Sequence, residues 1–140
     1  MTGSIKHADG ELTKGIAAYD AWIEAFRGDG IVPFFAYNIA VYSELRQFAV
    51  QFLRRLREDF VEHDWTFITD ALHHYEAVAS ALQGLADLFP FPGGGDPKDA
   101  QNIEKAVNLL EGAKRAEIDG LQALKHLREA LGSLQAEGIQ

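Results

Sequence analysis

The sequence predicts an all-α protein, an antiparallel four-helix bundle with an up-down-up-down path. Apolar residues recur every three or four positions along four separate stretches, which places them on one face of a helix. No stretch shows the alternation of polar and apolar residues that marks a half-buried strand. The connections between the stretches are short, as between neighbouring antiparallel helices. With 140 residues, 47% of them hydrophobic, the chain is expected to form one domain over residues 1–140.

The first helix is predicted over residues 11–27 and the second over residues 33–60. The glycine-rich segment 28–30 ends the first, and Pro33 suits the first turn of the second because its nitrogen has no hydrogen to leave unpaired. The front half of the second helix is apolar on nearly every side, so we expect protein to cover it on several sides. The side chains of the second helix that are predicted to face inward are Phe35, Val41, Tyr42, Leu45, Phe48, Ala49, Phe52, Leu56 and Phe60.

The third helix is predicted over residues 64–89, with Asp64 as its N-cap. Residues 89–97 contain prolines and consecutive glycines, which cannot continue a helix and therefore predict a loop. We expect Phe89 and Phe91 to fold over the end of the bundle.

The fourth helix is predicted over residues 97–131, with Asp96 as its N-cap. A straight helix over the whole apolar pattern would be about 58 Å long, which exceeds its partners. We therefore expect the helix to end near Leu131 or to bend near Gly112 or Gly120.

The charge and the amino-acid composition of the chain exclude several classes of function. The net charge of −8 argues against nucleic acid and anionic membranes as partners, because phosphates require a basic surface. The chain has no cysteine, which excludes disulfides, thiolate metal sites and cysteine nucleophiles within it and fits a cytoplasmic protein. Its N-terminal residues lack the apolar core of a signal peptide. The glycines at 93–95 lack the Lys-Ser/Thr of a phosphate loop, and no cofactor is predicted.

Polar side chains at apolar positions form the first candidate site. Asn38 interrupts the most hydrophobic part of the second helix, Glu117 occupies a seam position in the fourth, and Tyr19, Tyr42 and Tyr75 put hydroxyls on interior stripes. A buried polar group without a partner costs about 1–3 kcal/mol, so these groups should meet one another, water or a ligand. They form either a hydrogen-bond network that fixes helix register or a polar pocket that orients a small molecule.

A metal site on the third helix is the second candidate. The spacings Asp70-x-x-His73 and His73-x-x-Glu76 place carboxylates and imidazole on one helical face, with His74 adjacent. A di-iron bundle, however, needs two Glu-x-x-His motifs and two further glutamates. The sequence contains no Glu-x-x-His, and His73 lies off the apolar stripe, where solvent is its simplest neighbour.

Short residue patterns occur in each of the predicted helices and in the loop before the last one. They are Gly15-x-x-Ala18-Tyr19-x-Ala21-Trp22, Tyr37-Asn38 with Glu44-x-Arg46 and Phe52-Leu53, His74-Tyr75 with Ala79 and Leu82, Phe89-Pro90-Phe91-Pro92, and a last helix rich in Ala, Lys and Glu. Over most of residues 11–131 this set of patterns resembles the helical region of proteins related to butirosin biosynthesis protein H.

Those relatives pair a cysteine-peptidase-like acyltransferase region with helical additions. Because this chain has no cysteine, their catalysis cannot be carried over. The resemblance implies a helical module, free-standing or part of a larger protein, that binds a ligand or a partner. The positions it implies for binding are Tyr19, Trp22, Asn38, Tyr42, Glu44 and Arg46.

The sequence thus predicts a non-catalytic helical-bundle module that binds a small molecule or a protein partner. One alternative is a metal-dependent bundle enzyme that uses the His73/His74 cluster and Glu117. The other is a purely structural, dimerising protein. In that case the fourth helix extends beyond the bundle and pairs with a second copy to form a homodimer.

Overall fold

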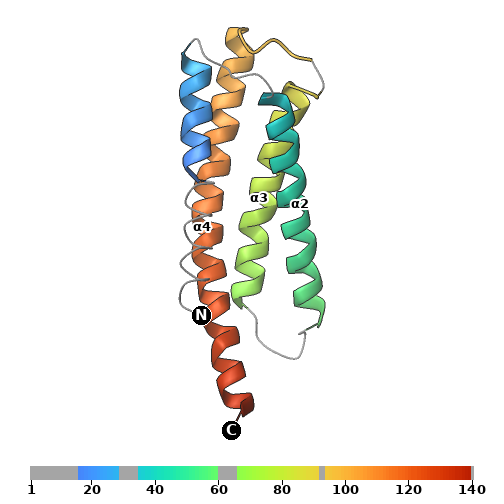
Figure 1. Ribbon diagram of the computed structural model, residues 1–140, viewed down its shortest axis with the longest axis vertical. Helices are drawn as coiled ribbons and strands as arrows, with labels where there is room; N and C mark the ends of the chain where they lie inside the picture. Colours follow the sequence, from blue (N-terminus) through green and yellow to red (C-terminus); the bar gives the residue numbers. More distant parts are fainter. Residues whose placement is uncertain (1–15, 29–34, 60–65, 92–93, 140) are drawn as a thin grey trace.

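The computed structural model describes residues 16–28, 35–59, 66–91 and 94–139, with the backbone alone from residue 134 onward. Successive helices run in opposite directions (Figure 1). The predicted all-α, up-down-up-down four-helix bundle is therefore confirmed. The predicted boundaries at residues 11, 33, 60 and 64, including the cap at Asp64, lie outside the described residues. The helices are residues 16–27 (called the N-terminal helix), α2 (Phe35–Asp59), α3 (Thr66–Leu88) and α4 (Ala100–Ile139).

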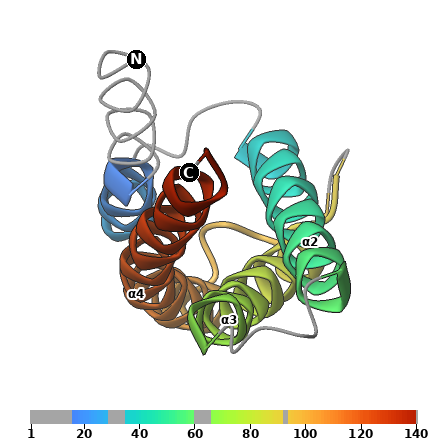
Figure 2. The same cartoon turned by 90° about the horizontal axis from the view of Figure 1, so that it is seen from below.

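Seen along the bundle, the helices follow an arc in the order N-terminal helix, α4, α3 and α2 (Figure 2). α4 packs against α3, and α3 packs against α2. Ion pairs join the N-terminal helix to α4, and Trp22 makes edge-to-face contacts with Phe35 and Tyr42 of α2. α2 therefore lies at one edge of the arc, with its neighbours on the inward side. No helix in the described ranges combines the length and hydropathy needed to cross a bilayer.

Two clusters of buried apolar side chains form the core. The upper cluster in the view of Figure 1 draws on all four helices, and the lower one on α2, α3 and α4. In the upper cluster the rings of Phe26, Phe35 and Phe89 lie with centroids 4.8, 5.4 and 5.7 Å apart, distances at which aromatic pairs attract. Phe89 thus closes the bundle end as predicted. Phe91 does not: it is 56% exposed and lies beside Tyr37, since Phe89 already fills the space between the other two rings.

The inward face of α2 differs from the predicted one. Leu45, Phe48 and Phe52, which the apolar stripe placed inside, are 52%, 57% and 64% exposed. At 100° per residue, α2 is rotated by roughly a quarter turn from the predicted orientation. The buried positions of α2 are Phe35, Ile39, Ser43, Val50 and Leu53.

The orientation of α2 differs from the predicted one because α2 is apolar on two sides. Its periodicity is satisfied by either side facing the core, so hydrophobicity alone does not choose between them. The orientation adopted brings Arg46 toward the interior, where it pairs with Glu117 of α4. The opposite side, here called the outer face of α2, carries Tyr37, Val41, Leu45, Phe48 and Phe52.

The start of α4 also differs from the prediction. Asp96, the predicted cap, instead makes a turn: its side chain accepts a hydrogen bond from Lys98 N at 2.9 Å, and its carbonyl accepts one from Asp99 N at 3.2 Å. The first helical bond runs from Ile103 N to the Asp99 carbonyl at 2.9 Å. Asp99 therefore takes the cap position, and the helix begins at Ala100 rather than at residue 97.

The end of α4 lies beyond the predicted one near Leu131. The helix is continuous over its 40 residues, about 60 Å, and it projects past the lower ends of α2 and α3 (Figure 1). Helical structure continues through Gly112 and Gly120, because an interior glycine costs only about 1 kcal/mol relative to alanine. Gly120 is buried, and its bare backbone is where the ring of Tyr75 packs onto α4.

Two glycine substitutions in α4 should have opposite effects. Gly112→Ala should raise the free energy of unfolding by about 0.5–1 kcal/mol, because a Cβ there meets nothing within 4 Å. Gly120→Ala should lower it by about 1–3 kcal/mol, because its Cβ would lie 2.7 Å from Tyr75 Cε2. Urea unfolding of both variants checks this. Equal gains would contradict the close packing of Tyr75 on α4.

Candidate functional site

Glu117 is the charged residue buried in the middle of the bundle. Its side chain is 1% exposed, and Ala113 and Gly120, about one helical turn away on either side, are buried with it. An ionised carboxylate in such a place is strongly unfavourable unless it is paired and hydrogen-bonded. The partners of Glu117 therefore define the first site.

Arg46 of α2 bonds both carboxylate oxygens. Its Nε donates to Glu117 Oε1 at 2.7 Å, and its Nη2 donates to Oε2 at 3.0 Å. This two-pronged contact matches a planar guanidinium to a planar carboxylate. The hydroxyl of Tyr19, which is fully buried on the N-terminal helix, donates to Oε1 at 3.0 Å. One carboxylate thus ties together three helices.

Aromatic rings cover this ion pair. The guanidinium carbon of Arg46 lies 5.1 Å from the ring centroid of Tyr42, within the range of a cation–π contact. Trp22 stands edge-to-face to Tyr42, with ring centroids 5.0 Å apart, and to Tyr19 at 6.0 Å. Only 15% of the Arg46 side chain remains exposed. The rings therefore keep most water away from the charges.

Tyr75 is the residue that α3 contributes to the same region. It is 5% exposed and packs against Gly120 of α4. The charges of Glu117 and Arg46 both act on its hydroxyl. The residues gathered here, called the Glu117 cluster below, are Tyr19, Trp22, Tyr42, Arg46, Tyr75 and Glu117.

Burial controls the ionisation of the cluster. It raises the pKa of the Tyr19 and Tyr75 hydroxyls well above the ordinary value, and the Glu117 carboxylate raises both further. Burial alone would lower the pKa of Arg46, but hydrogen bonds and charge from Glu117 outweigh it and raise that pKa. At neutral pH both tyrosines are therefore neutral and Arg46 is a cation.

The hydrogen bonds of the ion pair are directed at groups within the protein. Arg46 pairs with the Glu117 carboxylate, and the Tyr19 hydroxyl donates a hydrogen bond to the same carboxylate. Satisfied networks of this kind fix the relative positions of helices. The geometry therefore agrees with the predicted hydrogen-bond network that fixes helix register.

The structure does not bring two of the predicted site residues to this cluster. Asn38 lies half-buried on the flank of α2, and Glu44 lies exposed on the solvent side. Sequence reasoning also missed Ser43, which is 3% exposed and accepts a hydrogen bond from Gln47 Nε2 at 3.2 Å. Ser43 could have been found only by knowing how α2 is rotated.

The predicted metal residues do not converge. His73 is exposed and its ring lies 5.7 Å from that of His74, which is half-buried. Asp70 is exposed, and Glu76 accepts a hydrogen bond from Arg54 at 3.5 Å. Across the part of the chain that the structure describes, no three His, Cys, Asp or Glu side chains gather as a metal site would require. The metal hypothesis therefore has no ligand set in these ranges.

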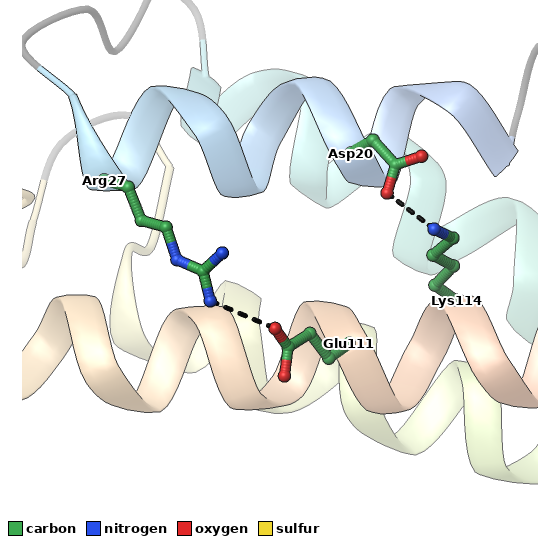
Figure 3. Close-up of polar contacts among 4 residues, drawn as sticks. All are labelled: Asp20, Arg27, Glu111 and Lys114. Carbon is green, nitrogen blue, oxygen red and sulfur yellow. Dashed lines mark hydrogen bonds and ion pairs between the residues drawn. The ribbon is translucent and has the colours of Figure 1, made fainter.

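A shallow groove of about 370 Å³ runs between the N-terminal helix and α4. Two ion pairs bridge it (Figure 3): Arg27 Nη2 lies 3.2 Å from Glu111 Oε1, and Lys114 Nζ lies 2.7 Å from Asp20 Oδ1. These side chains are 33–62% exposed, and such pairs contribute about 0–1 kcal/mol each. Four of the charged side chains that line the groove thus join the two helices. Its remaining lining residues are Ile23, Arg115 and Ile118.

Of the large hydrophobic side chains that are exposed in the described ranges, most lie on the outer face of α2. Leu45, Phe48 and Phe52 follow one another at helical spacing and are all more than half exposed. At its upper end Tyr37, 49% exposed, meets the ring of Phe91 with centroids 5.6 Å apart. Isolated exposed apolar residues are ordinary, whereas a contiguous group of them is typical of interaction surfaces.

Comparison of the chain with protein-family models, with curated proteins and with solved structures finds no match. The resemblance to the helical region of butirosin biosynthesis protein H-like proteins therefore stays a prediction.

Proposed function

We propose that this chain is a non-catalytic helical-bundle module that binds a protein partner through the outer face of α2. The observation that carries the proposal is the exposed stripe of Leu45, Phe48 and Phe52, on a helix whose opposite side already forms the core. Single domains rarely leave apolar patches of more than a few hundred Å² in water. A second apolar face on one helix is typical of a helix that packs against two partners.

A protein partner is favoured over a small molecule by the shape of the surface. Small-molecule sites are concave and enclose most of the ligand, whereas the stripe runs along one side of α2, a helix at the edge of the bundle (Figure 2). The alternative ligand site, the Glu117 cluster, has the hydrogen bonds of its ion pair directed at its own side chains. The partner surface that fits α2 is an apolar helix face.

Site-specific photo-crosslinking tests this proposal. A photoreactive benzoylphenylalanine is placed at position 48, or as a matched control at Phe67, a phenylalanine of α3 that is 39% exposed. In cells of the source organism, we expect an adduct of discrete mass from position 48 and not from position 67. Adding Leu45→Glu to the position-48 protein should remove the adduct, because a charge disrupts an apolar contact. No adduct, equal adducts at both positions, or an adduct indifferent to Leu45→Glu would each overturn the proposal.

A further inference from the structure

We infer that the partner is a second copy of this chain, bound antiparallel along the outer face of α2. This inference rests on the proposed function, because it identifies the occupant of the same surface. Three features support it: the area of the face, its symmetry and its distribution of charge.

The area of the outer face is close to what a stable dimer needs. A fully exposed aromatic side chain presents about 200 Å². With the exposed fractions of Tyr37, Leu45, Phe48 and Phe52 on this face, and of Phe91, which contacts Tyr37, the apolar surface amounts to roughly 500 Å² per copy. A standard interface buries about 800 Å² per partner, of which about 65% is apolar in homodimers. The exposed side chains of Glu44, Gln51 and Arg55 beside the stripe would supply the polar remainder.

The stripe is arranged so that it can pair with itself. A twofold interface requires a self-complementary surface, in which each residue meets its counterpart across the axis. In the run Val41, Leu45, Phe48, Phe52 the steps are four, three and four residues, which is symmetric about the midpoint between Leu45 and Phe48. An antiparallel copy centred there sets Leu45 against Phe48 and Val41 against Phe52 of the second copy. Every layer of such a contact is apolar.

The charges on α2 favour the antiparallel direction. Residues 47–59 carry three arginines, one glutamate and one aspartate, and because Arg54 pairs with Glu76 of α3, the remaining charges of this half sum to zero. Residues 35–46 carry Glu44 and Arg46, and because Arg46 is neutralised by Glu117, this half has a net charge of −1. An antiparallel pair places the arginine-bearing half of each copy beside the half of the other copy that carries Glu44. A parallel pair would place the arginines of both copies side by side.

Sedimentation equilibrium of the purified full chain measures the association. We expect a mass approaching twice the 15.5 kDa of the chain as its concentration rises from about 1 to 300 μM. Phe48→Glu should weaken the dimer at least about tenfold, because it sets two carboxylates near the axis of an apolar interface. Ile118→Glu is the matched control: the same change at a 47% exposed residue of α4 should leave the mass unchanged. Since both sites are exposed, circular dichroism should show both variants folded.

Disulfide crosslinking tests the direction, and the absence of native cysteine makes single-cysteine variants unambiguous. Phe52→Cys alone should not crosslink, because an antiparallel arrangement holds the two copies of residue 52 about 16 Å apart along the helix. Phe52→Cys mixed with Val41→Cys should crosslink, because a disulfide spans Cα atoms about 4.4–6.8 Å apart. Crosslinking of Phe52→Cys with itself would overturn the antiparallel arrangement.

The experiments distinguish a failure of the homodimer from a failure of the proposed function. A wild-type chain that stays a monomer at every concentration overturns the homodimer, and so does a dimer that is indifferent to Phe48→Glu. If position 48 then still gives an adduct with a different protein, the proposed function stands and only the identity of the partner is wrong. An adduct whose mass is twice that of the chain supports both.

Discussion

Glu117→Gln is expected to lower the free energy of unfolding by about 3–5 kcal/mol, the usual cost of removing one partner from a buried ion pair. Glutamine keeps the shape of glutamate but not its charge, so Arg46 is left as an unpaired cation with only 15% of its side chain exposed. Tyr19 also keeps only a neutral acceptor for its hydroxyl. The change should appear in urea unfolding followed by circular dichroism.

Glu111→Gln provides the matched control for this substitution. It makes the same chemical change on the same helix, but in the pair with Arg27, whose side chains are 62% and 43% exposed. The expected loss there is about 0–1 kcal/mol. Similar losses for Glu111→Gln and Glu117→Gln would show that the Glu117 cluster does not hold the helices together as inferred.

Apolar replacement of the three hydrogen-bonded residues of the Glu117 cluster tests whether the cluster only fixes helix register or also serves as a ligand site. A triple variant Tyr19→Phe, Arg46→Met, Glu117→Leu leaves no unpaired polar group at these positions. Exchanging a buried ion pair for apolar side chains of similar volume is often neutral or stabilising. If the cluster only fixes helix register, the triple variant should therefore be more stable than Glu117→Gln.

Leu53→Ala is expected to cost about 2–5 kcal/mol, whereas Phe52→Ala, at the neighbouring position, should cost less than about 0.5 kcal/mol. Leu53 is 2% exposed and belongs to the lower core cluster, so its truncation leaves a cavity. Phe52 is 64% exposed on the outer face. Unfolding is to be measured at low protein concentration, so that association does not add to the stability.

This pair of substitutions decides how α2 is rotated. The apolar stripe of the sequence placed Phe52 inside, and the structure places Leu53 there instead. If the phenylalanine proves the costlier residue to truncate, α2 sits as the stripe indicates and the outer face is not a binding surface. The proposed function and the homodimer would then both lose their basis.

Much of the fold follows from local periodicity. The N-terminal helix, α3 and α4 each carry one apolar stripe, and Tyr19, which was predicted to lie on an interior stripe, is fully buried. Leu82 of α3 and Leu110 of α4 are also fully buried. Glu117 could be recognised as a buried carboxylate because it interrupts such a stripe in α4. The sequence did not correctly predict where α4 ends, because the apolar pattern reports only on the part of the helix that packs against its neighbours.

By itself the sequence determined that the chain forms a four-helix bundle, and that a carboxylate and tyrosines would lie among apolar residues. Both follow from spacing along one helix at a time, which depends only on the 3.6-residue period. Only the tertiary structure decided which side of α2 faces the core, that Arg46 is the cation paired with Glu117, and that Leu45, Phe48 and Phe52 remain outside. The reason is that α2 has two apolar sides of similar strength. The choice between them depends on a contact between residues 71 positions apart in the chain, which no local pattern contains.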